Sequence, residues 1–372
     1  MKKVIFCTNI PSPYRVDFFN EFGKYCDLTV LYERHSSSER NDAWKGSSAQ
    51  NFNEVYLDLT PVGVDRARGP ALKNYIKTHV CDILIFTNYV SPATMEAIVW
   101  CRIHGRRYYI EYDGGFNKKD NLLKGLLKKF LLKGAIGHFT TADEHIRYLK
   151  SLGINETNIF KYPFTSISED DIAVANVLTT KGRDFYKRRL GISEKTMILT
   201  VGRFSYDNGY GKGFDILMKL AEYLDPSVGI YIVGDKPTAE FAQWKNSKNL
   251  EHVHFVGFKD KTDLAEYYAA ANIFTILSRG DVWGLVVNEA MSYGLPIITS
   301  DKCIAGIELV QDGVNGYIVN LDDFNYLKCK FEQLLSNENQ MEALGRNSFL
   351  SIAAYTYKHM VNKHLQIFMG GG

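Results

Sequence analysis

Two carboxylates stand out in an otherwise apolar stretch of the sequence. Asp281 and Glu289 are separated by seven residues in SRGDVWGLVVNEAMSYGLPIIT, residues 278–299. A carboxylate among Leu, Val, Ala and Met is costly to bury unless it is paired or hydrogen-bonded. The stretch follows the strand-like run NIFTILS, and a helix is predicted from Gly284. The acids are therefore expected at a strand end and early in a helix, where they could bind hydroxyl groups.

The same stretch offers donors for an anion. The N–H groups of Gly284, Leu285 and Val286 would lack intrahelical acceptors, and such helix ends bind phosphate. Asp281 precedes these amides, and Glu289 lies roughly a turn and a half into the helix. A nucleotide sugar has the matching order of sugar, diphosphate and ribose. The structural alternative is an aspartate that caps the helix and a glutamate buried against backbone amides.

A second segment, TVGRFSYDNGYGKGFDIL at residues 200–217, carries two cations. Arg203 follows a predicted strand, and Lys212 precedes a predicted helix. Two cations on one loop at the end of a strand suit a diphosphate. Taken alone, the segment is also typical of a solvated loop. The loop is made pliable by glycines 202, 209, 211 and 213.

Short β-branched or aromatic runs alternate with helical patterns through most of the chain, which is typical of parallel sheets covered by helices. A charged segment at residues 165–195 carries no strand signal, and we place the domain boundary within it. The prediction is two Rossmann-like, doubly wound α/β domains, 1–180 and 181–353. Ligands of such sheets bind beyond the carboxyl ends of the strands, so the domains should face each other across a cleft.

The overall composition narrows the class of protein. The net charge of +2 shows no imbalance that points to nucleic acid. The six cysteines and nine histidines show no metal-ligand spacing, so no metal site is predicted. Neither a signal peptide nor an apolar run of about 20 residues that could span a bilayer is evident. These features predict a cytoplasmic chain with reduced thiols.

Together these segments resemble the retaining glycosyltransferases of family 4, which have the GT-B fold. GRFSYDNGYGKGFDIL resembles the family's Gly-Arg…Lys-Gly loop for the donor phosphates. Residues 256–301 resemble its region of two acids separated by seven residues, and VQDGVNGYIV follows them. The likeness is carried by residues 196–320 and is weaker over 1–165. It implies that a C-terminal helix at about 354–370 packs back on the first domain.

The resemblance implies a role for the residues around the donor phosphates. Arg203 and Lys212 would bind the diphosphate and stabilise its growing charge as the bond to the sugar breaks, with Gly202 beside them. The amides of Gly284 and Leu285 would hold a phosphate. Neither a metal nor a cofactor is expected, because these groups can meet the charge of the nucleotide sugar.

Roles for the rest of the donor follow from the same resemblance. Glu289 would accept hydrogen bonds from the ribose hydroxyls, and Asp281 would hold hydroxyls of the transferred sugar. The backbone around Gly257 and Phe258 would line the base. The family's usual first acid is glutamate, so the shorter aspartate at 281 leaves the identity of the sugar open.

Many family members place a histidine after a strand in the middle of the first domain. The matching strand end here reads RRYYIEYDGGFN and has no histidine. Alternation along a strand puts Glu111 and Asp113 on one face and Tyr112 on the other. Asp113 is the predicted catalytic residue at the cleft. The alternative is an aspartate that stabilises the turn before two glycines.

The loop after the first strand, TNIPSPYR, occupies the family's position for a loop that faces the cleft. Ser12, Tyr14 and Arg15 are therefore candidate ligands on the acceptor side. Arg15 could equally form an ion pair with an acid on the surface.

Residues 117–134, NKKDNLLKGLLKKFLLKG, combine a leucine stripe at helical spacing with flanking lysines. A basic amphipathic helix is typical of elements that lie on a membrane surface. The candidates for membrane contact are Lys124, Lys128, Lys129 and Phe130. The alternative is an ordinary helix with its leucines in the core and its lysines in water.

The sequence as a whole predicts transfer of a hexose from a nucleotide sugar, with a UDP-sugar as first choice, to a saccharide hydroxyl with retained anomeric configuration. If the basic helix binds lipid, the acceptor would be lipid-linked and the chain peripheral on the inner face of a membrane. Two alternatives stay open: a nucleotide-sugar epimerase of the same architecture, and a non-catalytic scaffold. A nicotinamide oxidoreductase is disfavoured, because the first turn reads NIPSPYR rather than a glycine fingerprint.

Overall fold

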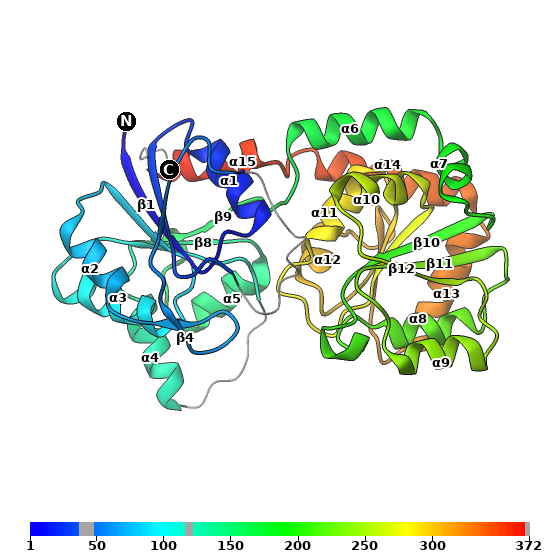
Figure 1. Ribbon diagram of the computed structural model, residues 1–372, viewed down its shortest axis with the longest axis horizontal. Helices are drawn as coiled ribbons and strands as arrows, with labels where there is room; N and C mark the ends of the chain where they lie inside the picture. The colour runs from blue at the N-terminus through cyan, green and yellow to red at the C-terminus, as the bar shows by residue number, and fades with distance from the viewer. Residues whose placement is uncertain (37–47, 116–121, 369–372) are drawn as a thin grey trace. The chain divides into compact units, whose positions relative to one another are not determined.

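The computed structural model describes residues 1–36, 48–115 and 122–368. The chain divides into two compact units, Met1–Thr165 with Thr356–Gly372, and Ser166–Tyr355 (Figure 1). The predicted boundary after residue 180 falls 15 residues later than this division. Helix α6 (Glu169–Thr180) packs against α10 (Lys261–Ala270) and α11 (Leu285–Ser292), so the second unit includes it.

The first unit is built on a seven-stranded sheet of order β3-β2-β1-β6-β7-β8-β9. Its strand pairs are parallel. Ile83–Phe86 is buried at every position, which explains why this strand reads as one continuous apolar run. The strands are β1 (Lys3–Thr8), β2 (Asp27–Tyr32), β3 (Asn53–Tyr56), β6 (Ile83–Phe86), β7 (Tyr109–Glu111), β8 (Gly137–Thr140) and β9 (Ile159–Lys161), and a small antiparallel pair is formed by β4 (Thr60–Pro61) and β5 (Ala67–Arg68).

Helices complete the first unit. The C-terminal helix α15 (Tyr357–Phe368) packs against α1 (Pro13–Phe22), so the end of the chain joins the unit in which it began (Figure 1). The other helices are α2 (Ala71–Thr78), α3 (Pro92–Ile103), α4 (Leu122–Leu132), α5 (Asp143–Ser151) and the short η1 (Glu156–Asn158).

The second unit holds a six-stranded parallel sheet of order β12-β11-β10-β13-β14-β15. The order reverses beside β10, where β11 and β13 lie on either side, and ligands of doubly wound sheets bind at such a point. The strands are β10 (Thr196–Val201), β11 (Val228–Val233), β12 (Val253–Gly257), β13 (Ile273–Ile276), β14 (Ile297–Ser300) and β15 (Gly316–Val319).

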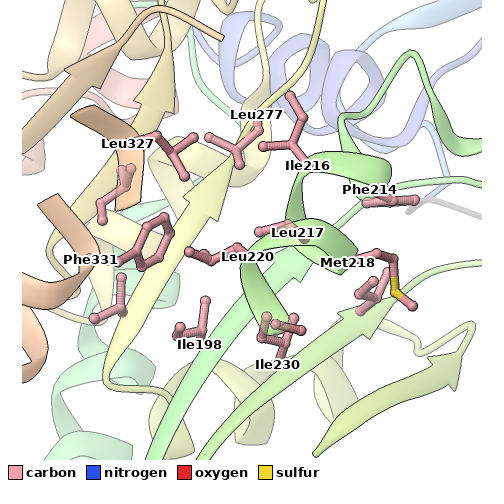
Figure 2. Packing of buried hydrophobic residues seen from close by; sticks show 14 of the residues in the cluster. Ile198, Phe214, Ile216, Leu217, Met218, Leu220, Ile230, Leu277, Leu327 and Phe331 are labelled. Atoms are coloured by element: carbon pink, nitrogen blue, oxygen red, sulfur yellow. The ribbon is translucent and has the colours of Figure 1, made fainter. Parts of the chain in front are cut away.

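An apolar cluster fixes helix α8 on the sheet of the second unit. Figure 2 shows α8 (Phe214–Ala221) directing Leu217 and Leu220 towards Ile198 and Ile230 of the sheet and towards Phe331. This packing holds the start of α8, and the loop before it, against the sheet. The remaining helices are α7 (Arg183–Leu190), η2 (Asp207–Gly209), α9 (Ala239–Ser247), α12 (Ile304–Leu309), α13 (Phe324–Leu335) and α14 (Glu338–Ile352).

Two findings bear on the predicted basic helix. Its described part, α4, begins at Leu122, and the predicted residues 117–121, including Lys118 and Lys119, lie outside the described residues. Within the described ranges, no helix combines the length and the apolar character needed to cross a bilayer.

Candidate active site

The predicted diphosphate loop follows β10 and is held by an acid from the neighbouring strand end. Asp235, which follows β11, accepts from the backbone N–H of Phe204 and from that of Ser205 at 3.0 Å. The N–H of Gly202 donates to the carbonyl of Val233 at 2.9 Å. Arg203 therefore sits on a backbone that is tied to β11 on both sides of it.

Gly213 shows why the loop closes on a glycine. Its φ of +71° lies in the left-handed region, and a Cβ there would be 2.0 Å from the carbonyl oxygen of Leu277. Both features require glycine. The loop consequently lies directly against the end of β13, and α8 starts at the next residue.

The two predicted segments meet through a charge pair. Lys212 Nζ lies 2.5 Å from Asp281 Oδ2, and the two side chains are 19% and 17% exposed. The backbone of Asp281 is fixed by the segment after β14: its N–H donates to Lys302 at 2.9 Å, and its carbonyl accepts from Ile304 at 3.3 Å. A cation and an acid that are far apart in sequence thus share one point at the carboxyl edge of the sheet.

Helix α11 begins beside this pair. Its N-cap is Gly284, with φ of +102°, and a Cβ there would be 2.7 Å from Cys303 Sγ. The alternative of a capping aspartate is therefore wrong, because the carboxylate of Asp281 pairs with Lys212 instead. The first amides of α11, including that of Leu285, lie at a helix N-terminus, as the predicted phosphate site requires. Burial raises the pKa of the Cys303 thiol to about 12, which disfavours the thiolate that a nucleophile needs.

Glu289 is held by two hydroxyls rather than by backbone amides. Its carboxylate accepts from Ser166 Oγ at 2.9 Å and from Tyr268 Oη at 3.0 Å. Burial raises its pKa above the ordinary value of 4.5, although these two hydrogen bonds oppose the shift. The side chain is consequently fixed in one orientation early in α11.

The predicted base-lining residues end β12. Gly257 accepts from the N–H of Gly234 at 3.1 Å, which places it beside the end of β11. Phe258 follows it with 43% of its side chain exposed. These residues lie along the same sheet edge as Gly202 and Asp281, because β12, β11, β10 and β13 are consecutive neighbours in the sheet.

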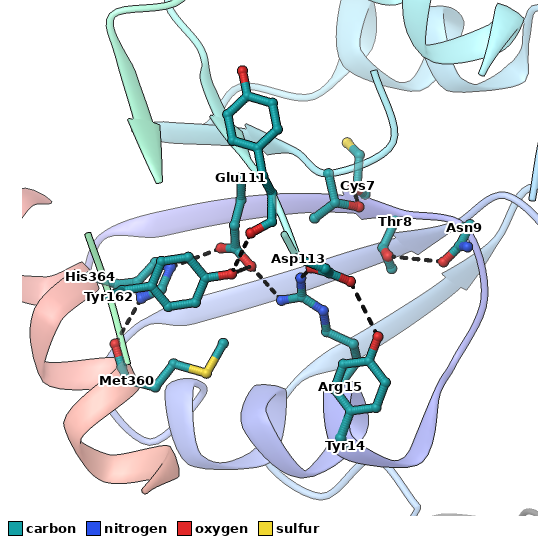
Figure 3. A network of polar contacts seen from close by, with 12 residues as sticks. Cys7, Thr8, Asn9, Tyr14, Arg15, Glu111, Asp113, Tyr162, Met360 and His364 are labelled. Carbon is teal, nitrogen blue, oxygen red and sulfur yellow. Dashed lines mark hydrogen bonds and ion pairs between the residues drawn. The ribbon is translucent and has the colours of Figure 1, made fainter. Parts of the chain in front are cut away.

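The charged residues predicted in the first unit form a buried network (Figure 3). Arg15 is 2% exposed and forms ion pairs with both Glu111 and Asp113. Glu111 also contacts His364 Nε2 at 2.8 Å and accepts from Tyr162 Oη at 3.2 Å. The predicted shared face of Glu111 and Asp113 is confirmed, since both reach Arg15.

This network corrects the interpretation of the loop after β1. Arg15 is neither at the surface nor open to a ligand, because two carboxylates already bind its guanidinium. Ser12 is 3% exposed, and its carbonyl accepts from the N–H groups that start α1. Tyr14 donates to Asp113 Oδ2 at 3.2 Å, and Asp113 remains 35% exposed. Asp113 and Tyr14 are the members of this set that reach partly exposed positions.

The electrostatics of the network favour an ionised Glu111 at its centre. Burial alone would raise the pKa of Glu111, but the charge of Arg15 and the contact with His364 lower it to about 2. Burial raises the pKa of Asp113, and Arg15 opposes that rise. Such a saturated arrangement is typical of a structural ion network.

Sequence reasoning did not single out Asp235, Arg279, Tyr268 or His364. Asp235 carries a usable signal, because it directly follows a buried strand in the way that Arg203 does. The other three act through partners that are distant in the chain. The described residues contain no group of three or more His, Cys, Asp or Glu side chains placed to hold a metal ion.

The second unit also matches a known family. Residues 182–350 fit the model described as Glycosyl transferases group 1. These residues are similar to a glycosyl transferases group 1 domain. The matched residues contain both predicted segments, and the cation loop, the acid pair and the α11 N-terminus all lie within them.

Similar proteins come from several organisms. The lipopolysaccharide glucosyltransferase WaaG of Escherichia coli is 27% identical over 352 residues, which cover 89% of this chain and 87% of WaaG. An uncharacterised 41.2 kDa protein of the Klebsiella pneumoniae cps region is 33% identical over 134 residues, 36% of this chain and 35% of that protein. The matches to the Klebsiella, Methanocaldococcus, Arabidopsis and Haemophilus relatives span only 33–63% of their lengths.

Solved structures match the whole chain. WaaG has a TM-score of 0.71 at 17% identity and covers 99% of this chain and 100% of its own. Anabaena HepE in complex with UDP has a TM-score of 0.72 at 16% identity and covers 100% of both. These likenesses confirm the predicted fold class, two Rossmann-like units of the GT-B type. The match of residues 182–350 and the similarity to WaaG support the predicted enzyme class, a glycosyltransferase.

Proposed function

We propose that the chain is a retaining glycosyltransferase of family 4 that moves a hexose from a UDP-sugar to a hydroxyl of a saccharide acceptor. The observation that carries this proposal is the pairing of Lys212 with Asp281 beside the N-terminus of α11. A diphosphate beside that pair would meet a cation and unpaired helix amides, and the sugar attached to it would meet an acid.

Each group has a role in binding the donor. Arg203 and Lys212 bind the diphosphate, and the amides of Gly284 and Leu285 hold its outer phosphate. Glu289 accepts from the ribose hydroxyls while Ser166 and Tyr268 fix its orientation. Asp281 turns one carboxylate oxygen to Lys212 and leaves the other for a hydroxyl of the sugar.

The reaction follows from these roles. The bond from the anomeric carbon to the diphosphate oxygen breaks, and the acceptor oxygen bonds to the same face of that carbon. The acceptor proton passes to the departing diphosphate. Arg203 and Lys212 stabilise the negative charge that grows on this leaving group, and a positioned cation acts most strongly when that charge is largest.

The choice of donor and product class is supported by the relatives. HepE is described in complex with UDP, with UDP and glucose, and with UDP-glucose. WaaG is described as a lipopolysaccharide glucosyltransferase. A UDP-hexose donor and a role in the assembly of a cell-surface polysaccharide are therefore the proposals for this chain.

The test is a thermal-shift panel of UDP, GDP, ADP, TDP and NAD, each with and without a chelator. A ligand at a hundred times its dissociation constant adds about 2.7 kcal/mol to stability, which is readily detected. We expect UDP alone to stabilise the protein, the chelator to have no effect, and Lys212→Ala to weaken the response. An absence of response to every nucleotide would overturn the proposal.

The exposed face of α4 supports an acceptor at a membrane. Four side chains spaced along one stripe are largely exposed: Leu123 (78%), Leu126 (56%), Leu127 (45%) and Phe130 (46%). The alternative that α4 buries its leucines is wrong for this stripe, although Leu131 and Leu132 on the other face are buried. Lysines at 124, 128 and 129 flank the stripe. We infer that α4 holds the enzyme on an anionic lipid surface near a lipid-linked acceptor.

Vesicle co-sedimentation tests this inference. We expect binding to vesicles that contain phosphatidylglycerol and none to pure phosphatidylcholine. Lys124→Gln with Lys129→Gln should weaken binding by roughly 30-fold, at about 1 kcal/mol per basic residue. Val80→Gln is the matched control, because Val80 is 81% exposed in the same unit but outside α4. Equal binding by the lysine variant would overturn the inference.

A further inference from the structure

Arg279 connects the two loops that carry the donor-site charges. It lies two residues before Asp281, in the turn after β13. Its backbone N–H donates to the carbonyl of Gly211 at 2.9 Å, and its guanidinium donates to the carbonyl of Tyr210. The same guanidinium forms a fork with Asp215, with Nη1–Oδ1 and Nη2–Oδ2 both at 2.7 Å.

These contacts enclose Lys212 on both sides. Tyr210 and Gly211 precede it, and Asp215 follows it in the first turn of α8. A further bond of 3.3 Å joins Tyr206 Oη to the carbonyl of Gly280. The two loops are therefore joined by several directional bonds, of which the bond between Lys212 and Asp281 is one.

The chemistry of the fork suits a positioning role better than a stabilising one. Arg279 is 42% exposed and Asp215 is 17% exposed, and exposed ion pairs contribute little to stability. A planar guanidinium that binds both carboxylate oxygens fixes orientation in a way that a lysine cannot. Displacement of a reacting group by about 1 Å can cost a hundredfold in rate.

We propose that Arg279 is a positioning residue that sets the distance of Lys212 from Asp281 and from the α11 N-terminus. The inference rests on the proposed function, because loss of this spacing would lower the rate of the sugar-transfer step. It assigns to Arg279 and Asp215 a role in turnover although neither touches the reacting atoms.

Steady-state kinetics on the full chain with the nucleotide sugar test the role. Arg279→Lys keeps the charge and removes the fork, and Asp215→Asn removes its acceptor. We expect each to lower kcat about tenfold, with KM changed less than threefold and an unfolding midpoint close to that of the wild type. The double variant should be no slower than either single variant, because both changes break the same fork.

A background that lacks Lys212 separates a positioning role of Arg279 from a general loss of order in the two loops. In Lys212→Ala protein, the effect of Arg279→Lys should shrink to less than twofold, because there is no ammonium left to position. The matched control is Arg189→Lys, which alters another ion pair of the same unit, with Glu266 at 3.0 Å, and should leave kcat unchanged.

Two results would overturn the inference. One is a wild-type kcat in both single variants, and the other is an undiminished effect of Arg279→Lys when Lys212 is absent. Failure of the proposed function has a different signature: the wild-type protein would neither respond to nucleotides nor turn over any nucleotide sugar, and both proposals would then fall together.

Discussion

The two units contain charge clusters of similar composition and different character. Arg15 meets Glu111 and Asp113 in the first unit, and Lys212 meets Asp281 in the second. Each cluster joins a cation from the segment after one strand to an acid at or after the end of another strand. The first pair, Arg15 and Glu111, is 2% and 0% exposed, whereas Lys212 and Asp281 are 19% and 17% exposed.

The difference lies in burial and in how fully each charge is already satisfied. Glu111 has three side-chain partners, Arg15, Tyr162 and His364, which leave no room for a ligand to compete. Lys212 has one carboxylate partner and the N-terminus of α11 nearby. In the proposed function, an incoming diphosphate shares or replaces that carboxylate. The same residue types would therefore stabilise the fold in one unit and bind a substrate in the other.

The largest effect that this comparison predicts is on stability. Arg15→Ala removes the cation from the buried Glu111 and from the partly exposed Asp113, and loss of one partner from a buried ion pair costs about 3–5 kcal/mol. Lys212→Ala should cost less than about 1 kcal/mol, because its pair is partly exposed. Urea denaturation of the two variants measures both values. Equal losses would remove the distinction between the clusters.

The second effect is a loss of folding stability at low pH, on the order of 3 kcal/mol for a pKa shift of this size. The pKa of Glu111 is lowered from 4.5 to about 2 in the folded chain, so its contribution is fully present above about 4.5 and is lost as the pH falls through about 2. Stability should consequently decline over that window. Glu111→Gln cannot titrate, and its stability should be lower at neutral pH and flatter over the same window. An identical acid slope in both proteins would contradict this account.

The sheets were predictable from sequence because parallel strands buried on both faces read as short apolar runs, as in Ile273–Ile276. The boundary was predicted 15 residues too late. The charged residues of α6 gave no indication in the sequence that this helix packs on α10 and α11. Arg203, Lys212 and Asp281 could be located since each follows a strand or precedes a helix.

The sequence could not show which side chains pair across distant segments of the chain. His364 lies 253 residues from Glu111, and no local pattern connects a C-terminal helix with the end of β7. Arg15 looked like a loop ligand because its burial depends on how α1 lies over the sheet. The fork between Arg279 and Asp215 likewise depends on the approach of Gly213 to Leu277, which only the folded chain reveals.

The third effect is a loss of turnover when the cation of the second cluster is removed. Lys212→Ala should lower kcat by about a hundredfold, equivalent to about 2.7 kcal/mol, because one positioned charge that stabilises the leaving group is lost. Measured turnover of the nucleotide sugar gives the value, and a retained unfolding midpoint shows that the fold is intact. Near-normal turnover would mean that the loop after β10 does not bind the diphosphate.

The smallest effect distinguishes Glu289 from Glu111 by the sign of their pKa shifts. Burial raises the pKa of Glu289 above 4.5, whereas the pKa of Glu111 falls to about 2. Protonation of Glu289 removes a charged acceptor for the ribose hydroxyls, so UDP affinity should begin to weaken at a pH above 4.5. Glu289→Gln should bind UDP about tenfold more weakly at neutral pH, the cost of a lost charged hydrogen bond.

Isothermal titration from pH 7.5 down to pH 5 measures this effect. Phosphate groups themselves titrate near pH 6, about the value of a phosphoester's second ionisation, so the informative quantity is the difference between the wild type and Glu289→Gln. That difference should narrow as the pH falls, because protonation makes the wild-type carboxyl resemble the amide. A difference that stays constant over this range would show that Glu289 remains ionised, and that Ser166 and Tyr268 outweigh its burial.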